Sequence, residues 1–230
     1  SGTAHDLHFL AGRIEAESPG ALVLAARSNE GRTKDGVAAG GERLAAEIRE
    51  CIRQYPSLQQ ISLVGNSLGG LYVRYTAKLL YDPTSRTIAG LQPRTLMTLA
   101  CPHLGIRGFT FVPVPSPLQP LARVLVGQTG DDLFLRDRRR LLATMATDRE
   151  YLEPLAAFRN RILFANVEGD FMVPYGTAAI DASREGRPGA WDGVSRGRGG
   201  SGIVSDSQWD IGSRPISRFQ GTGEVAGMAA

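Results

Sequence analysis

The sequence predicts an α/β fold, built on a mostly parallel sheet with helices on both faces. Short apolar runs alternate along the chain with longer segments whose apolar residues recur at helical spacing. That alternation is typical of parallel strands joined by crossover helices. The chain has 230 residues, 42% of them hydrophobic, which is enough for one full core. We therefore expect one globular domain.

Four strands and four helices are predicted from these patterns. The strands fall at residues 21–26, 61–64, 95–99 and 161–167, and the helices at 1–18, 40–55, 71–80 and 131–146. Phe109 to Val126 is too broken by proline for a strand and too apolar for an exposed loop. It is either a lid or acyl-binding wall, or a connection packed on the surface.

The strongest functional pattern is the turn Gly65-Asn66-Ser67-Leu68-Gly69, which fits G-x-S-x-G between a predicted strand and a predicted helix. Such a turn lifts the serine hydroxyl clear of the sheet and aims the helix N-terminus at it. Glycine at 65 and 69 avoids collisions with the neighbouring backbone. Ser67 is therefore the candidate nucleophile, and the backbone N–H of Leu68 is a candidate oxyanion donor.

The pattern alone has a second interpretation, because a Gly-rich turn before a helix can also serve only packing or anion binding. The chain contains another match, Gly193-Val194-Ser195-Arg196-Gly197. No apolar run precedes Ser195 and no helical pattern follows it. We interpret that match as accidental.

Asp170 is the candidate acid of a catalytic triad. It follows the last predicted strand, and the carboxyl ends of parallel strands are where α/β enzymes gather their catalytic groups. The alternative is a turn aspartate that accepts hydrogen bonds from backbone N–H groups. Glu168 is a rival carboxylate that lies nearer the strand.

Composition limits the other classes of function. The net charge is +3 with a pI near 9.1, and much of the excess lies in tail arginines (Arg184, Arg187, Arg196, Arg198, Arg214 and Arg218). From residue 181 onward Gly, Arg and Ser dominate, which predicts a disordered tail. One RGG-like stretch at 196–200 is too little to predict nucleic-acid binding.

The two cysteines, Cys51 and Cys101, lack metal-ligand spacing, so we expect buried free thiols rather than a disulfide framework. No apolar run is long enough to span a membrane, and no charged-then-apolar leader is present.

In combination, five short motifs resemble the serine esterase family DUF676, whose members are lipase-like α/β-hydrolases. The resemblance covers residues 1–180 and implies hydrolysis of carboxylic esters, with lipid acyl esters as substrates, by Ser, Asp and His without metal or organic cofactor. It implies a hydrophobic ester or lipid partner, peripheral contact with a membrane, no nucleic acid, and a cytoplasmic or membrane-peripheral location. The motifs are Thr33-x-Asp35-Gly36, Gly40-Gly41-Glu42-Arg43-Leu44, the elbow with Gly70, Tyr72, Arg74 and Tyr75, Pro102-His103-Leu104-Gly105, and Asp170-x-x-Val173-Pro174 with Thr177 and Ala178.

The chain departs from the family pattern in two places. The family's His-Gly-Leu-x-Gly loop, which gives a second oxyanion donor, would finish about where Ser1 stands. The base should also follow the acid, in the order Ser, Asp, His, yet His5, His8 and His103 all precede Asp170. His103 is either a substitute base or structural. His5 and His8 either belong on the polar side of the first helix or line the cleft.

These departures predict a partial α/β-hydrolase domain at residues 1–180, followed by a tail at 181–230. The domain would lack its first strands at the N-terminus, and its last strand and histidine loop at the C-terminus. Without the histidine the chain would be an inactive serine esterase. The alternatives are a catalytically dead binding or interaction domain, or an acyltransferase that uses an alcohol or thiol as acceptor.

Overall fold

A computed structural model of the chain describes residues 4–107, 127–167, 169–170, 172–181 and 225–229. Its centre is a five-stranded sheet in the order β1-β7-β2-β5-β6, and all neighbouring strands are parallel. The predicted α/β fold with a parallel sheet is confirmed. The strands are β1 (Val23–Ala25), β2 (Gln60–Asn66), β5 (Gln92–Leu99), β6 (Asn160–Phe164) and β7 (Val225–Ala229).

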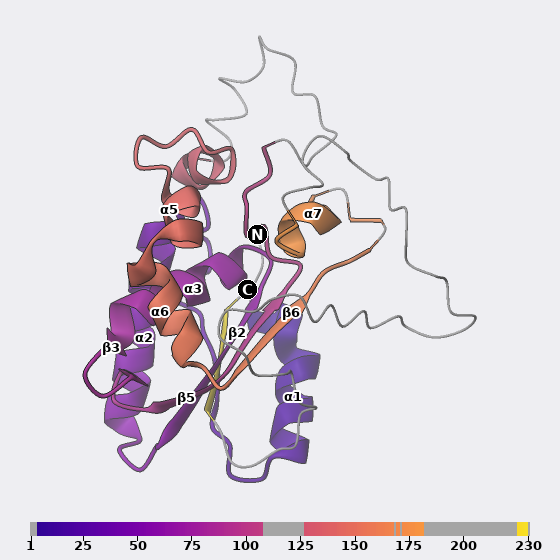
Figure 1. Cartoon of the computed structure of the whole chain (residues 1–230). Coiled ribbons are helices and arrows are strands. Elements are labelled where there is room, and N and C mark those ends of the chain that lie inside the picture. The colour runs from indigo at the N-terminus through magenta and orange to yellow at the C-terminus, as the bar shows by residue number, and fades with distance from the viewer. Residues whose placement is uncertain (1–3, 108–126, 168, 171, 182–224, 230) are drawn as a thin grey trace.

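Helices lie on both sides of this sheet. Figure 1 shows α2, α3 and α6 on one side and α1 on the other, as the sequence predicts. None of the helices in the described ranges is long and apolar enough to cross a membrane. The helical elements are η1 (Ala4–Leu7), α1 (His8–Glu17), α2 (Val37–Gln54), α3 (Leu68–Leu80), α5 (Leu141–Thr147), α6 (Arg149–Ala157) and α7 (Tyr175–Ala178).

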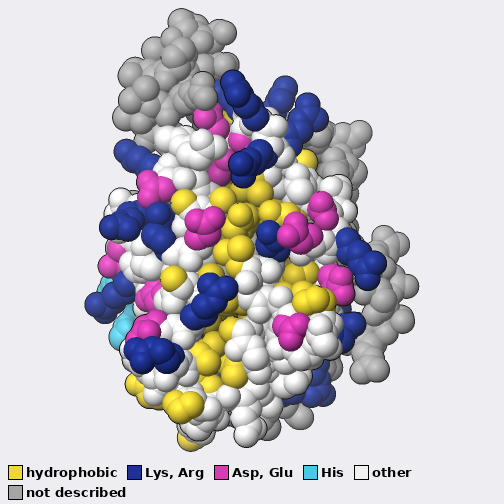
Figure 2. Space-filling view, turned by 90° about the vertical axis from the view of Figure 1, so that its left-hand side faces the viewer, with side chains coloured by type: hydrophobic (Ala, Val, Ile, Leu, Met, Phe, Trp, Pro, Cys, Tyr) yellow, Lys and Arg dark blue, Asp and Glu magenta, His cyan; other side chains and the backbone are white. Residues whose placement is uncertain are grey.

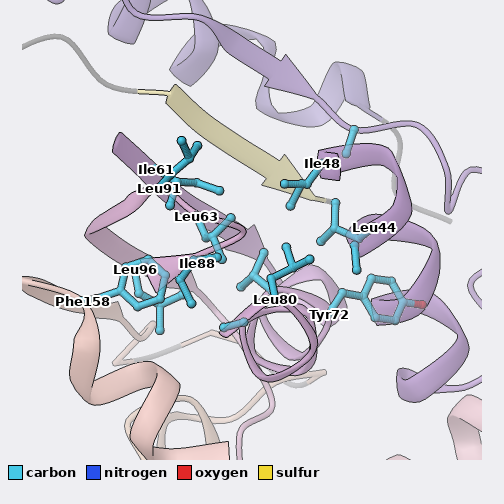
Figure 3. Close-up of a cluster of buried hydrophobic side chains, with 14 residues drawn as sticks. Leu44, Ile48, Ile61, Leu63, Tyr72, Leu80, Ile88, Leu91, Leu96 and Phe158 are labelled. Atoms are coloured by element: carbon cyan, nitrogen blue, oxygen red, sulfur yellow. The ribbon is translucent and has the colours of Figure 1, made fainter. Parts of the chain in front are cut away.

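The main core lies between the sheet and the layer of α2, α3 and α6. Leu44 and Ile48 are buried on one face of α2 because they are four positions apart, and Ile61 and Leu63 point to that same side of β2. Figure 3 shows these side chains meeting those of α3 and β5, with further labelled residues Tyr72, Leu80, Ile88, Leu91, Leu96 and Phe158. This core fixes α3 against the end of β2, where Ser67 lies.

Close packing of α2 on α3 depends on a glycine. A Cβ added to Gly40 would lie 2.1 Å from the Tyr72 ring, so only glycine leaves room for that ring. One turn further along α3, the Thr76 hydroxyl donates a hydrogen bond of 2.8 Å to the Gly41 carbonyl. The Gly40-Gly41 pair of the sequence is therefore explained by this helix contact.

The prediction of one helix over residues 131–146 is wrong. The chain is helical at 127–133, then forms a loop in which Leu135 and Arg140 have positive φ of 55° and 46°, and becomes helical again in α5. The Asp137 carboxylate accepts a hydrogen bond of 2.8 Å from the Leu141 N–H and so stabilises the start of α5. The Arg138 to Arg140 run is exposed, as expected.

Elements that the sequence patterns did not predict also appear. Helix α6 contains Pro154, which interrupts the expected helical pattern, and the two-stranded antiparallel ladder of β3 (Tyr81–Asp82) and β4 (Thr87–Ile88) is too short to show a periodicity. Strand β7 falls within the expected tail and pairs with both β1 and β2. Residues 182–224 and the apolar stretch 109–126 lie outside the described residues.

The outer surface of the helix layer carries charges of both signs. Figure 2 shows Lys and Arg interspersed with Asp and Glu around a band of hydrophobic side chains on this face. This side of the molecule therefore presents no large surface of a single sign.

Candidate active site

Ser67 stands between the last residue of β2 and the first residue of α3, in a backbone conformation that non-glycine residues rarely adopt. Its φ is 51° and its ψ is −122°. The Ser67 N–H donates to the Leu99 carbonyl at 2.8 Å, and the Ser67 carbonyl accepts from the Gly70 N–H at 3.0 Å. Such strain, about 1–3 kcal/mol, persists only where the surrounding structure imposes it, and it is concentrated at functional sites.

Glycines permit the sharp bend around Ser67. A Cβ on Gly65 would lie 2.5 Å from the Gly69 carbonyl oxygen and 2.6 Å from the Gly70 Cα, as the sequence predicts for Gly65. A Cβ on Gly70 would lie 2.5 Å from the Cys101 Sγ. The Gly69-Gly70 doublet in the sequence is the signal that could have predicted this second close approach.

Leu68 is the first residue of α3. The N–H groups in the first turn of an α-helix have no partner within the helix, and the helix dipole favours negative charge there. Ser67 itself is half-buried, so its side chain is not wholly packed into the core. This arrangement could hold an oxyanion next to a serine hydroxyl.

Asp170 lies on the same edge of the sheet as Ser67. The strands β2 and β6 are parallel to the intervening β5, so the residues that follow each of them leave at one edge (Figure 1). The Asp170 carboxylate accepts hydrogen bonds from the Asn166 side chain at 3.0 Å and from the N–H groups of Met172 and Val173 at 3.1 and 2.8 Å. It therefore holds its own turn together. Glu168, the rival carboxylate, lies outside the described residues.

His103 occupies the interior of the molecule and is 3% exposed. The guanidinium Nη1 of Arg74 lies 3.0 Å from its Nδ1, and the Thr98 Oγ1 lies 3.0 Å from its Nε2. An arginine side chain can only donate, so Nδ1 must be the acceptor and Nε2 must carry the proton. Both ring nitrogens are thus engaged within the core.

Burial and the neighbouring Arg74 charge hold the pKa of His103 well below its ordinary value. The imidazole is therefore neutral at physiological pH, and its one basic nitrogen is taken by Arg74. This geometry favours the structural interpretation of His103 over that of a substitute base.

The other two histidines lie in the N-terminal helical segment. His5 and His8 are both exposed, and their rings stack with centroids 5.5 Å apart. Within the described part of the chain no hydrogen bond joins either of them to the Ser67 turn, and Ser195 lies outside that part. No group of three or more His, Cys, Asp or Glu side chains in the described ranges is arranged to hold a metal ion. Both cysteines are free, with Cys101 buried and Cys51 half-buried.

A parallel sheet with flanking helices and a strained serine between strand and helix define an α/β-hydrolase-like protein. The chain belongs to the family described as "Putative serine esterase (DUF676)", which matches residues 1–183.

Curated relatives carry names of the same class. The chain is 30% identical over 179 residues to "Putative lipase C4A8.10" of Schizosaccharomyces pombe. This match covers 72% of the chain and 22% of that relative. It is 31% identical over 163 residues to "Putative lipase ROG1" of Saccharomyces cerevisiae, and this match covers 69% of the chain and 23% of that relative. The chain thus spans less than a quarter of the length of these relatives. No solved structure matches it.

Proposed function

We propose that this chain is the serine-bearing part of a carboxylic-ester hydrolase that acts on lipid acyl esters. The observation that carries the proposal is the strained Ser67 conformation, with φ of 51° and ψ of −122°, at the junction of β2 and α3. Strained backbone conformations are concentrated at functional sites, and this one falls on the serine of the G-x-S-x-G turn. The family and the names of the relatives support the same class of enzyme.

In the proposed reaction the Ser67 Oγ attacks the ester carbonyl carbon and forms a tetrahedral oxyanion. The N–H of Leu68 donates to that oxyanion, and collapse of the adduct expels the alcohol and leaves an acyl-serine, which water then hydrolyses. The Ser67 proton must pass to a base and then to the leaving alcohol. Asp170 would orient that base, because its carboxylate retains acceptor capacity beyond its three hydrogen bonds.

No histidine in the described part of the chain is placed to take the Ser67 proton. His103 has no free lone pair, and none of the three histidines of the chain follows Asp170. We propose that the base is a histidine that follows Asp170 in a longer protein, in keeping with the order Ser, Asp, His.

The lipid assignment rests on exposed apolar side chains beside Asp170. Six large hydrophobic side chains are exposed among the described residues, and four of them, Leu163, Phe164, Val167 and Met172, lie at the end of β6 and in the loop that carries Asp170. Exposed apolar side chains along the segment that carries the candidate acid would suit a hydrophobic partner. An acyl chain, or the surface of a membrane, would cover them.

Because both ring nitrogens of His103 are engaged within the core, a second candidate function is also favoured. In this alternative the domain keeps the fold for binding but does not catalyse a reaction. A fluorophosphonate probe separates the two, because it labels only an activated serine. We expect labelling of Ser67 in a protein that contains the base, and hydrolysis of p-nitrophenyl esters that improves from acetyl to palmitoyl chains. Absence of labelling would favour the binding domain, and preference for the shortest chain would remove the lipid assignment.

Two alanine variants make this test specific to Ser67. Ser67→Ala should abolish labelling and hydrolysis. Ser28→Ala is the matched control, because Ser28 is also half-buried, follows strand β1, and has a buried hydroxyl without a hydrogen-bond partner among the described residues. Activity that survives Ser67→Ala would reject Ser67 as the nucleophile.

A further inference from the structure

We propose that the turn at residues 101–105 mechanically couples the Ser67 turn to the Asp170 loop, with His103 acting as a neutral positioning residue within it. The inference rests on the proposed function, since it assigns a role relative to the nucleophile and the acid. The coupling would hold Ser67 and Asp170, which follow different strands, at a fixed distance from each other.

The turn contacts the start of α3 directly. A Cβ on Gly70 would lie 2.6 Å from the Cys101 Cβ, so the first turn of α3 is packed against Cys101 with no space to spare. The Ser67 N–H is bonded to Leu99, two residues before Cys101. Displacement of the turn would therefore displace the backbone that carries Ser67.

Arg74 forms the second attachment between α3 and the turn. Arg74 is 6% exposed, and its guanidinium donates to the His103 Nδ1 at 3.0 Å and to the Met145 carbonyl at 2.8 Å. Buried charge is tolerated only with good hydrogen-bond acceptors. The imidazole is thus an acceptor on which the burial of Arg74 depends.

Histidine suits this position because it accepts and donates at the same time. While Nδ1 accepts from Arg74, the protonated Nε2 donates to the Thr98 Oγ1 on β5. One neutral ring therefore connects α3 to β5. The strand, the helix and the turn that surround Ser67 share a single buried cluster.

The same turn reaches the acid loop on its other side. The Leu104 N–H donates to the Thr177 Oγ1 at 3.0 Å, and Thr177 is fully buried in α7. Four residues earlier in the chain, Val173 is 6% exposed, and its N–H donates to the Asp170 carboxylate at 2.8 Å. The turn therefore fixes α7, and α7 fixes the loop that holds Asp170.

The coupling is tested with a matched pair of threonine variants. Thr177→Val removes the acceptor for the Leu104 N–H, whereas Thr129→Val removes a buried acceptor for the Gly36 N–H at the start of α2 and leaves the hydrogen bonds of the turn in place. We expect Thr177→Val to shift the backbone amide resonance of Leu68 in the 230-residue protein. In a longer protein that contains the base, we expect the same variant to lower kcat about 10-fold with little change in KM. Thr129→Val should do neither, and Thr177→Ser should restore the parent values.

His103 variants separate positioning from acid–base catalysis. His103→Gln keeps one acceptor and one donor, so we expect kcat within a few-fold of the parent, whereas His103→Leu strands Arg74 and should behave like Thr177→Val. Equal loss of activity in both variants at unchanged stability would overturn the proposal, because a base cannot be replaced by an amide.

Failure of the proposed function remains distinguishable. If the longer protein that contains the base neither hydrolyses esters nor labels with fluorophosphonate, the function fails, and the Leu68 amide resonance of the 230-residue protein alone decides the coupling. An unmoved Leu68 resonance in both Thr177→Val and His103→Leu would overturn it, and a shift confined to these two variants would support it.

Discussion

Asp132 accepts a hydrogen bond of 2.7 Å from the backbone N–H of Val37, although the two residues are 95 positions apart. Val37 is the first residue of α2, and the residue before it, Gly36, has no side chain to cap the helix. Asp132 therefore performs from a distant segment the capping that a local Ser or Asp performs in most helices. The 127–133 helix is thereby fixed to the start of α2.

Replacement of Asp132 should destabilise the protein through this cap. We expect Asp132→Ala to lower the free energy of unfolding by about 1–3 kcal/mol, because the buried Val37 N–H loses its acceptor. Asp132→Asn retains an acceptor oxygen and should lose less. Urea denaturation measures both variants, and equal midpoints for Asp132→Ala and the parent would contradict the cap.

Glycine at position 65 should be indispensable to the fold. Gly65→Ala places a methyl group 2.5 Å from a backbone oxygen, and we expect a loss of about 3 kcal/mol or failure to fold. Gly12→Ala is the matched control, because Gly12 is exposed in α1 with nothing within 4 Å of the added carbon. That variant should gain up to about 1 kcal/mol from helix propensity. Equal stability of the two variants would show that the bend after β2 is not tight.

Relief of strain at position 67 should oppose function. Ser67→Gly permits a φ of 51° without penalty, so we expect it to exceed Ser67→Ala in the free energy of unfolding by about 1 kcal/mol, after the entropic cost of glycine. Both variants should be inactive. Thermal and urea denaturation measure the free energy of unfolding of both variants. A glycine variant that is less stable than the alanine variant would show that the backbone at position 67 is not strained.

Stability should fall on the acidic side of pH 6.5 because of His103. The unfolded chain binds a proton at this residue below its ordinary pKa of 6.5, whereas the folded chain does not, since burial first and the Arg74 charge second lower the pKa. The unfolded state then binds more protons, so the free energy of unfolding decreases as pH falls, by up to about 1.4 kcal/mol per pH unit. His103→Gln should reduce this slope between pH 5 and 6.5.

His8→Gln supplies the control for the removal of a histidine as such, because His8 is exposed. Parallel pH profiles for the parent and His103→Gln would contradict a neutral, buried imidazole.

The sequence patterns predicted the strands and helices that have a regular spacing of apolar residues. They predicted less of the structure that depends on contacts between residues far apart in the sequence. Strand β2, the turn at Ser67 and helix α3 were predictable because local periodicity and glycine placement specify them. The partners of His103 were not, because Arg74 lies 29 residues before it and is adjacent only after α3 packs on the sheet. The break before α5 depends on the positive φ of Arg140, which no composition signal announces.

The position of β7 has a practical consequence for handling the protein. Ala229 pairs with Gly65, two residues before Ser67, so β7 lies beside the end of β2 that leads into the Ser67 turn. A version of the protein that ends before residue 225 would lose the strand that joins β1 to β2. Such a version would therefore be unsuitable for assays of Ser67.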